Sequence, residues 1–114
     1  MTRHHTGDLN TLVAFDAPVR APNGMGGSQT SWAEQFQAWA KVIWLRGGET
    51  VISARLAGRQ PAVFVIGQSQ DSALLDTDWV ARDIETGKSY VVRAIIPTDD
   101  RAFFEVTVEG GVPV

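Results

Sequence analysis

The fold is decided by residues 79–108, which read WVARDIETGKSYVVRAIIPTDDRAFFEVTV. This stretch predicts three strands, because short runs rich in β-branched and aromatic residues alternate with polar turns. The strands are expected at Trp79–Ile84, Ser89–Ile96 and Phe103–Val108. The turns between them are ETGK at 85–88 and PTDDR at 97–101. The last third of the chain is therefore predicted to be a β-meander, whose final strand has Phe104, Val106 and Val108 on one face.

Upstream of the meander, Ser31–Leu45 is a long aromatic segment without glycine or proline. Its last residues, Lys-Val-Ile-Trp-Leu, favour a strand. A helix over Trp32–Ala40 is the alternative, because Trp32, Phe36 and Trp39 are spaced i, i+4 and i+7. We predict the strand.

The N-terminal region predicts another strand, which leads into a glycine-rich turn. In Leu9–Val19, apolar residues recur at alternate positions, as in a half-buried strand. Pro18 and Pro22 bracket the end of this strand, where proline is tolerated. Ala21–Ser28 contains an Asn-Gly pair and three glycines, which adopt positive φ readily. We expect a mobile hairpin tip there.

The middle of the chain predicts the one helix. Glu49–Gly58 has an acid at its start, Arg55 near its end and a glycine that stops it. A compact apolar strand follows at Pro61–Gly67, and Gln68–Asp78 is polar and turn-like.

These elements predict a mostly β fold, a small six-stranded β-barrel or sandwich with one short helix. A chain of 114 residues fits one domain, and no linker or repeat divides it. We expect a flexible tail at 1–7 and the β-barrel at 8–110.

Composition narrows the classes of function. The chain has no cysteine, which excludes disulfides, zinc–thiolate sites and thiol catalysis and suits a reducing cytoplasm. Its net charge of −3 gives no strong attraction for nucleic acid or anionic lipid. No apolar run approaches the roughly 20 residues that span a bilayer. The first residues lack the apolar region of a signal peptide, so we expect neither secretion nor a membrane anchor.

The sequence offers no constellation for catalysis or metal binding. Its two histidines, His4 and His5, lie in the terminal tail without further ligands at metal-binding spacing. The aspartate pairs at 76/78 and 99/100 lie in predicted turns, where aspartate bonds the local backbone. The glycine-rich segment 23–27 lacks the lysine and the following helix of a phosphate loop. We expect no enzyme activity, no catalytic residue, no metal and no cofactor.

The four tryptophans point to a protein interface. We expect two or three of them in the core, but the Ser31–Leu45 strand carries aromatic residues on both faces, more than one barrel interior can hold. Exposed tryptophan is typical of protein interfaces. Stacking on nucleic-acid bases ranks lower, because few basic residues, Lys41 and Arg46, lie among the rings.

Several motifs, taken in order, cover nearly the whole chain. They are the strand from Leu9 to Pro18, the glycine-rich tip at 23–27, Ser31-Trp32, Trp39-Ala40-Lys41-Val42, Leu45-Arg46-Gly47-Gly48-Glu49, Tyr90-Val91-Val92, the hairpin Pro97–Arg101 and Phe104–Val108. In this order they resemble the head–tail joining proteins of long-tailed bacteriophages and gene transfer agents. These are small connector subunits called head-closure or stopper proteins.

The resemblance implies a small β-barrel with one helix, in a homo-oligomeric ring of six or twelve copies at the head–tail junction of a virion. The ring would lie below the portal or adaptor protein and above the tail terminator protein. It would close the channel on packaged double-stranded DNA, without sequence specificity, and give the tail a platform. Assembly would take place in the cytoplasm of the bacterial host, with no membrane involved.

The same resemblance implies roles for particular residues. The loop between the second and third strands, Arg46–Gln60, is expected to act as the channel gate through Arg46, Glu49, Arg55 and Arg59. Protein interfaces are expected at the glycine-rich tip and at the surplus tryptophans. These residues are Gly24, Met25, Gly26, Trp32, Trp39 and Trp44.

Two alternatives to the stopper role stay open. One is a different ring of the same connector, either the adaptor or the tail terminator, because small barrels serve several positions. The other is a nucleic-acid-binding module of the OB type, which would be held on single-stranded DNA in a salt-dependent way.

Overall fold

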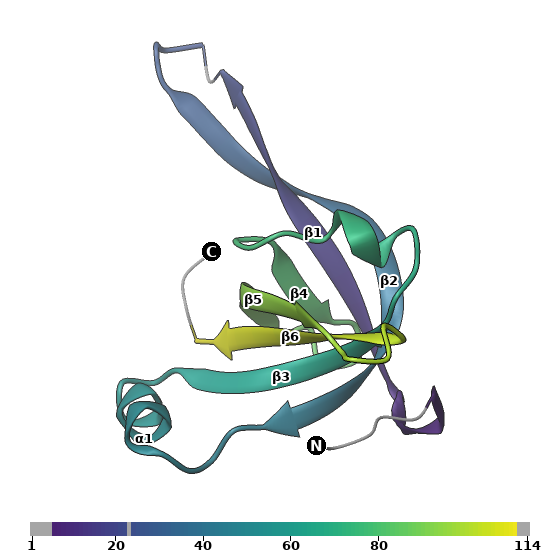
Figure 1. The fold of residues 1–114 in the computed structure, drawn as a ribbon. Coiled ribbons are helices and arrows are strands. Elements are labelled where there is room, and N and C mark those ends of the chain that lie inside the picture. The colour runs from purple at the N-terminus through teal and green to yellow at the C-terminus, as the bar shows by residue number, and fades with distance from the viewer. Residues whose placement is uncertain (1–5, 23, 112–114) are drawn as a thin grey trace.

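The computed structural model describes residues 6–22 and 24–111, so His4 and His5 lie outside the described residues. The elements in chain order are η1 (Thr6–Asp8), β1 (Thr11–Pro22), β2 (Ser28–Trp44), α1 (Glu49–Leu56), β3 (Gln60–Gly67), η2 (Ser72–Leu74), β4 (Val80–Asp83), β5 (Ser89–Pro97) and β6 (Phe103–Gly110). The strands close into a barrel in the order β1-β2-β3-β6-β5-β4 (Figure 1). The predicted mostly β fold, with six strands and one short helix, is confirmed.

All neighbouring strands of the barrel run antiparallel. The predicted meander is present as β4, β5 and β6, with the turn at 85–88 in place. Its second turn begins one residue later than expected, because β5 includes Pro97, which pairs with Phe104. The ring is closed by β1 and β4, which pair from Val13↔Asp83 to Asp16↔Val80.

Side chains fill the barrel interior, as in other small barrels. Phe15 and Phe36 stack with their ring centroids 4.9 Å apart, and the edge of Phe64 meets the ring of Tyr90 at 5.2 Å. The final strand adds Val106 and Val108, both fully buried, while Phe104 packs beside them. This confirms the predicted inner face of the last strand.

The aromatic segment forms a strand, so the helix over Trp32–Ala40 is wrong and the predicted strand is confirmed. β2 pairs with β1 as far as Ala40, and from Ala40 to Trp44 it also pairs with β3. The backbone of Trp32–Ala40 thus pairs with β1, and within this stretch only Ala40 also has β3 as a neighbour. Tertiary pairing of this kind overrides the helical spacing of three aromatic side chains.

The β1–β2 hairpin extends well beyond the barrel as a two-stranded ribbon (Figure 1). We call this ribbon the arm, formed by Ala17–Pro22 of β1 and Ser28–Ala33 of β2. At about 3.3 Å per residue, its six residue pairs reach about 20 Å. The predicted hairpin tip is confirmed in position, and Gly24 and Gly26 there have φ of 80° and 84°. Asn23 lies outside the described residues.

Pro18 does not end the strand, and this expectation was wrong, since β1 continues through it to Pro22. The backbone N–H of Ile84 donates to the carbonyl of Leu12, so the even-numbered residues of β1 turn their backbone groups toward β4 and away from β2. The nitrogens of Pro18 and Pro22 therefore face an open edge, where β2 needs no donor from them.

An ion network marks the point where the arm leaves the barrel. Phe15 pairs with Phe36 and Asp16 with Glu34, so Gln35 is an extra residue and forms a β-bulge. Arg82 of β4 donates to the Asp16 carboxylate at 3.2 Å and to the Glu34 carboxylate at 3.0 Å. The hydrogen bond to Asp16 raises the pKa of Arg82. One guanidinium thus links three strands at the bend.

The first prediction concerns packing at the end of β6. A Cβ at Gly110 would lie 2.7 Å from two carbons of the Tyr90 ring. We expect Gly110→Ala to lower the free energy of unfolding by about 1–3 kcal/mol, measured by chemical denaturation. Gly67→Ala is the matched control, because a Cβ at Gly67 meets nothing within 4 Å. Equal losses in the two variants would contradict the packing argument.

The second prediction concerns the ion network. Arg82→Met leaves the Asp16 carboxylate, which is only 7% exposed, without its cationic partner. We expect a loss of about 1–3 kcal/mol in the free energy of unfolding at neutral pH. Asp16→Asn combined with Arg82→Met is expected to lose less than the sum of the two single variants, because no buried charge is left unpaired. Strictly additive losses would show that the two side chains act independently.

Candidate functional site: exposed assembly surfaces

The arm presents apolar side chains to solvent at its tip and along its length. Met25 at the tip is 90% exposed, between Gly24 and Gly26. Along the ribbon, Val19 and Trp32 are also exposed. The paired residues of the arm include a single charged side chain, Arg20. Charge-poor exposed surface is typical of a contact with another macromolecule.

The predicted interface tryptophans lie on three different parts of the molecule. Trp32 is on the arm, Trp39 lies on the outer wall of the barrel opposite Leu12, and Trp44 lies at the end of β2. All three are exposed, and Trp39 is the most exposed at 55%. The expectation of two or three core tryptophans was wrong, since only Trp79 packs against the core. β2 carries more large side chains than the barrel interior holds.

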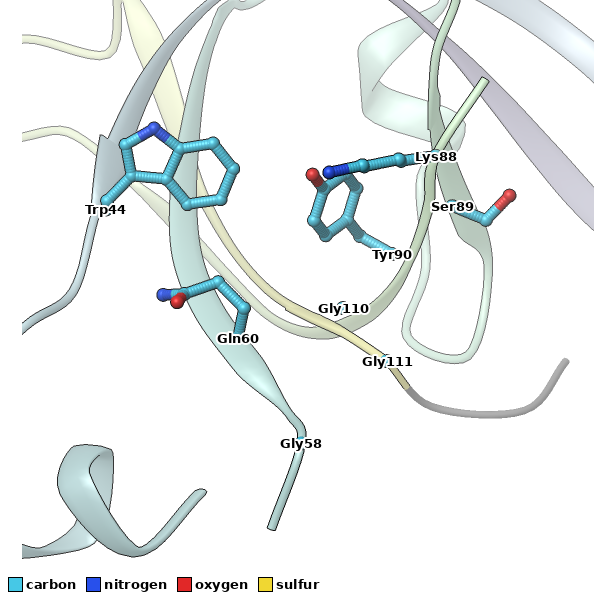
Figure 2. A pocket seen from close by; sticks show the side chains of 8 residues that line it. All are labelled: Trp44, Gly58, Gln60, Lys88, Ser89, Tyr90, Gly110 and Gly111. Carbon is cyan, nitrogen blue, oxygen red and sulfur yellow. The ribbon is translucent and has the colours of Figure 1, made fainter. Parts of the chain in front are cut away.

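The barrel mouth near α1 holds a hollow of about 360 Å³ (Figure 2). Trp44 and Tyr90 line it with ring centroids 6.1 Å apart, and Lys88 lies beside Tyr90. Backbone of Gly58, Gly110 and Gly111 forms part of its wall. Burial raises the pKa of Tyr90, with a smaller contribution from the charge of Asp83, so the phenol stays neutral at physiological pH. The hollow offers aromatic surface with one adjacent cation.

The predicted gate residues lie in the β2–β3 connection, as expected from the sequence. Glu49 is the first residue of α1, and Arg55 lies in its last turn. Arg46 and Arg55 line a second hollow, of about 500 Å³, together with Trp44. Arg59 instead faces β6, with its guanidinium 3.7 Å from the Glu109 carboxylate. The structure thus brings two of the four gate residues together and turns a third toward the barrel wall.

The connection that carries these residues is only lightly attached to the barrel. No residue of α1 is buried, and Leu56 is 86% exposed. Gly48 and Gly58 flank the helix with φ of 89° and 84°, which side chains other than glycine rarely adopt. A helix without buried residues, held between two such glycines, can change position without disturbing the core.

Two features of the structure could not be predicted from the sequence. The mouth hollow needs Trp44 and Tyr90 from strands that are distant in sequence, and the ion network needs β1, β2 and β4 together. The sequence signal for the ion network was Asp16, a lone aspartate with apolar residues on both sides of it in β1. A buried carboxylate requires a cationic partner, which is a reason to look for an arginine.

The acidic residues of the predicted turns serve the local backbone, and they do not gather with other potential metal ligands in the described part of the chain. Within residues 6–22 and 24–111, no group of three or more His, Asp or Glu side chains could hold a metal ion. In the same residues, no helix has the length and apolar character needed to cross a membrane. Asp76 and Asp100 accept hydrogen bonds from the backbone N–H groups of Thr77 and Ala102, which confirms their turn role.

Solved structures with a similar fold include two that cover nearly the whole chain. The solution structure of protein SF1141 from Shigella flexneri 2a superposes with a TM-score of 0.69 at 14% sequence identity, over 97% of this chain and 100% of that one. A chain in the virion of a native gene transfer agent particle superposes with a TM-score of 0.62 at 19% identity, over 91% of this chain and 96% of that one. At these identities the likeness is one of fold.

Comparison at the level of sequence gives a more direct result. No curated protein matches the chain. The family model of the phage head completion protein, however, matches residues 5–109, which include the arm, the β2–β3 connection and all of the barrel except Gly110. The chain therefore belongs to the phage head completion protein family.

Proposed function

We propose that this protein is a head–tail connector subunit of a phage or phage-like particle. It forms a ring below the portal, closes the DNA channel after packaging and gives the tail its attachment platform. The observation that carries the proposal is the family match over residues 5–109 of a chain whose exposed features suit assembly. The fold shared with a chain of a gene transfer agent virion supports it. The function is structural, and the subunit performs no catalysis.

The exposed apolar residues suit a subunit that contacts several neighbours. A closed ring needs two different surfaces on each subunit, because each copy meets the next in a head-to-tail manner. The arm, the outer wall around Trp39 and the barrel mouth around Trp44 are three separate candidates for such contacts. Partners above and below the ring, the portal or adaptor and the tail terminator, would use the remaining surfaces.

The β2–β3 connection suits a gate. Because α1 buries no residue, it can extend into the channel in one state and withdraw in another at little cost to the barrel. Arg46 and Arg55 supply the charge to meet DNA phosphates, and Glu49 moderates it, while Arg59 is held at the barrel wall by Glu109. The net charge of −3 for the whole subunit limits the friction on DNA that passes through, since each neutralised phosphate adds affinity.

The position of the protein in the particle is tested by deleting its gene. We expect electron micrographs to show heads that are full or leaking DNA beside separate, complete tails, because the joining ring is missing. DNA content per head is scored in the same preparation. Normal tailed particles would overturn the proposal and would favour the OB-type nucleic-acid-binding role, to be tested by salt-dependent retention on single-stranded DNA.

The gate is tested by replacing α1, Glu49–Leu56, with a short glycine–serine linker. We expect the barrel to keep its thermal unfolding midpoint within a few degrees and the ring to assemble, because no helix residue is buried. Filled heads are then expected to lose their DNA. A matched control replaces the exposed residues of the β4–β5 turn, 85–88, with the same linker. Full DNA retention by the α1 variant would remove the gating role and leave the connector role in place.

A further inference from the structure

The arm is unusual because no third strand pairs with it among residues 6–22 and 24–111. β4 pairs with β1 only as far as Asp16, and β3 pairs with β2 only from Ala40 onward. From Ala17 to Pro22 and from Ser28 to Ala33, each strand has the other as its one neighbour in the sheet. A two-stranded ribbon with both faces exposed is marginally stable in water, and a further strand or a packing surface stabilises it.

The two edges of the arm differ in their ability to accept another strand. Pro18 and Pro22 turn their nitrogens outward, so the β1 edge offers one outward donor, that of Arg20. Edge prolines of this kind block strand addition. The β2 edge is different. Ser28, Thr30 and Trp32 lie opposite Pro22, Arg20 and Pro18, in pairs that are not hydrogen-bonded to each other. Their N–H and C=O groups therefore point to the open side.

The β2 edge also fits a copy of itself. Antiparallel pairing centred on Ser31 places Thr30 opposite Trp32 of the second copy and Ser28 opposite Glu34 of the second copy. Glu34 is the one charged side chain in Ser28–Gln35, so no like charges meet in this register. The result is a four-stranded sheet, β1-β2-β2-β1, whose two outer edges are both blocked by prolines. Such a sheet is finite, and no third arm can add to it.

We propose that the β2 edge of the arm, Ser28–Gln35, pairs with the same edge of a second copy, so that the free protein is a two-fold dimer before it docks in a particle. This inference concerns the free protein and does not rest on the proposed function. In the dimer, the second copy covers the open edge until assembly into a particle replaces that copy with another partner. Because the contact is a short pairing of exposed strands, we expect dimerisation to depend on protein concentration.

The edge is tested by sedimentation equilibrium of the purified full chain. Thr30→Pro removes an N–H that points away from β1. The pairing of residue 30 with Arg20 loses no hydrogen bond, because the pairs at Pro18 and Pro22 already lack one. Each dimer loses two donors, so we expect the dissociation constant to rise about tenfold or more. Thr30→Val keeps the N–H and is expected to dimerise as the parent chain does. A monomeric parent chain, or equal dimerisation of both variants, would overturn the proposal.

A second measurement does not depend on proline. The chain has no cysteine, so Ser31→Cys introduces a single thiol near the centre of the proposed pairing. A short bis-maleimide is expected to link two copies of this variant, because residues opposite each other in a sheet have Cβ atoms about 5 Å apart. Glu85→Cys, in the exposed β4–β5 turn, is the control and is expected to stay monomeric on denaturing gels. Equal linking of the two variants would contradict pairing through the arm.

Discussion

The pairing of β1 with β4 is the constraint on which the rest of the structure depends. It closes the barrel between Val13↔Asp83 and Asp16↔Val80, and then it ends. Without this pairing, β1 and β4 would be exposed sheet edges. The stacked rings of Phe15 and Phe36 would then no longer be shielded from solvent. Because β4 is short, β1 continues beyond the last residue that pairs with β4. The remainder of β1 leaves the barrel together with β2, which creates the arm.

The ion network stabilises this departure from the barrel. Asp16 is almost fully buried at the last closing pair, where an unpaired carboxylate would be costly. Arg82 reaches it from β4 and also holds Glu34, next to the bulge on β2. The direction of the arm is thus coupled to the closure of the barrel through one side chain. A protein that presents its arm to neighbours needs such a fixed base, since a mobile one would add ordering entropy to every contact.

Much of the fold could be predicted from local patterns. The meander follows from short apolar runs separated by polar turns, and the helix follows from an acid, an arginine and a glycine in sequence. The prolines misled the prediction of where β1 ends, because their effect depends on which edge their nitrogens face. The number of core tryptophans was also misjudged. Alternation assigns a residue to a face of the strand, but only the barrel's size decides how many rings fit inside.

The candidate surfaces also differ in how far they could be predicted from the sequence. The predicted gate residues lie in the β2–β3 connection and the glycine-rich tip lies in a hairpin turn, and the sequence indicates both segments by their composition. The mouth hollow, built by Trp44 and Tyr90, could not be predicted, because its rings come from strands that meet only in the closed barrel.

By itself, the sequence determined that this chain is β-rich and without cysteine, and which of its segments become strands, turns and helix. Periodicity and turn chemistry are local properties, so they can be read along the chain. Only the tertiary structure decided that the ring closes through β1 and β4, that the arm has one open and one blocked edge, and that Arg82 joins three strands. These features depend on strand register and on which way each backbone group faces. Both are set when distant segments pair.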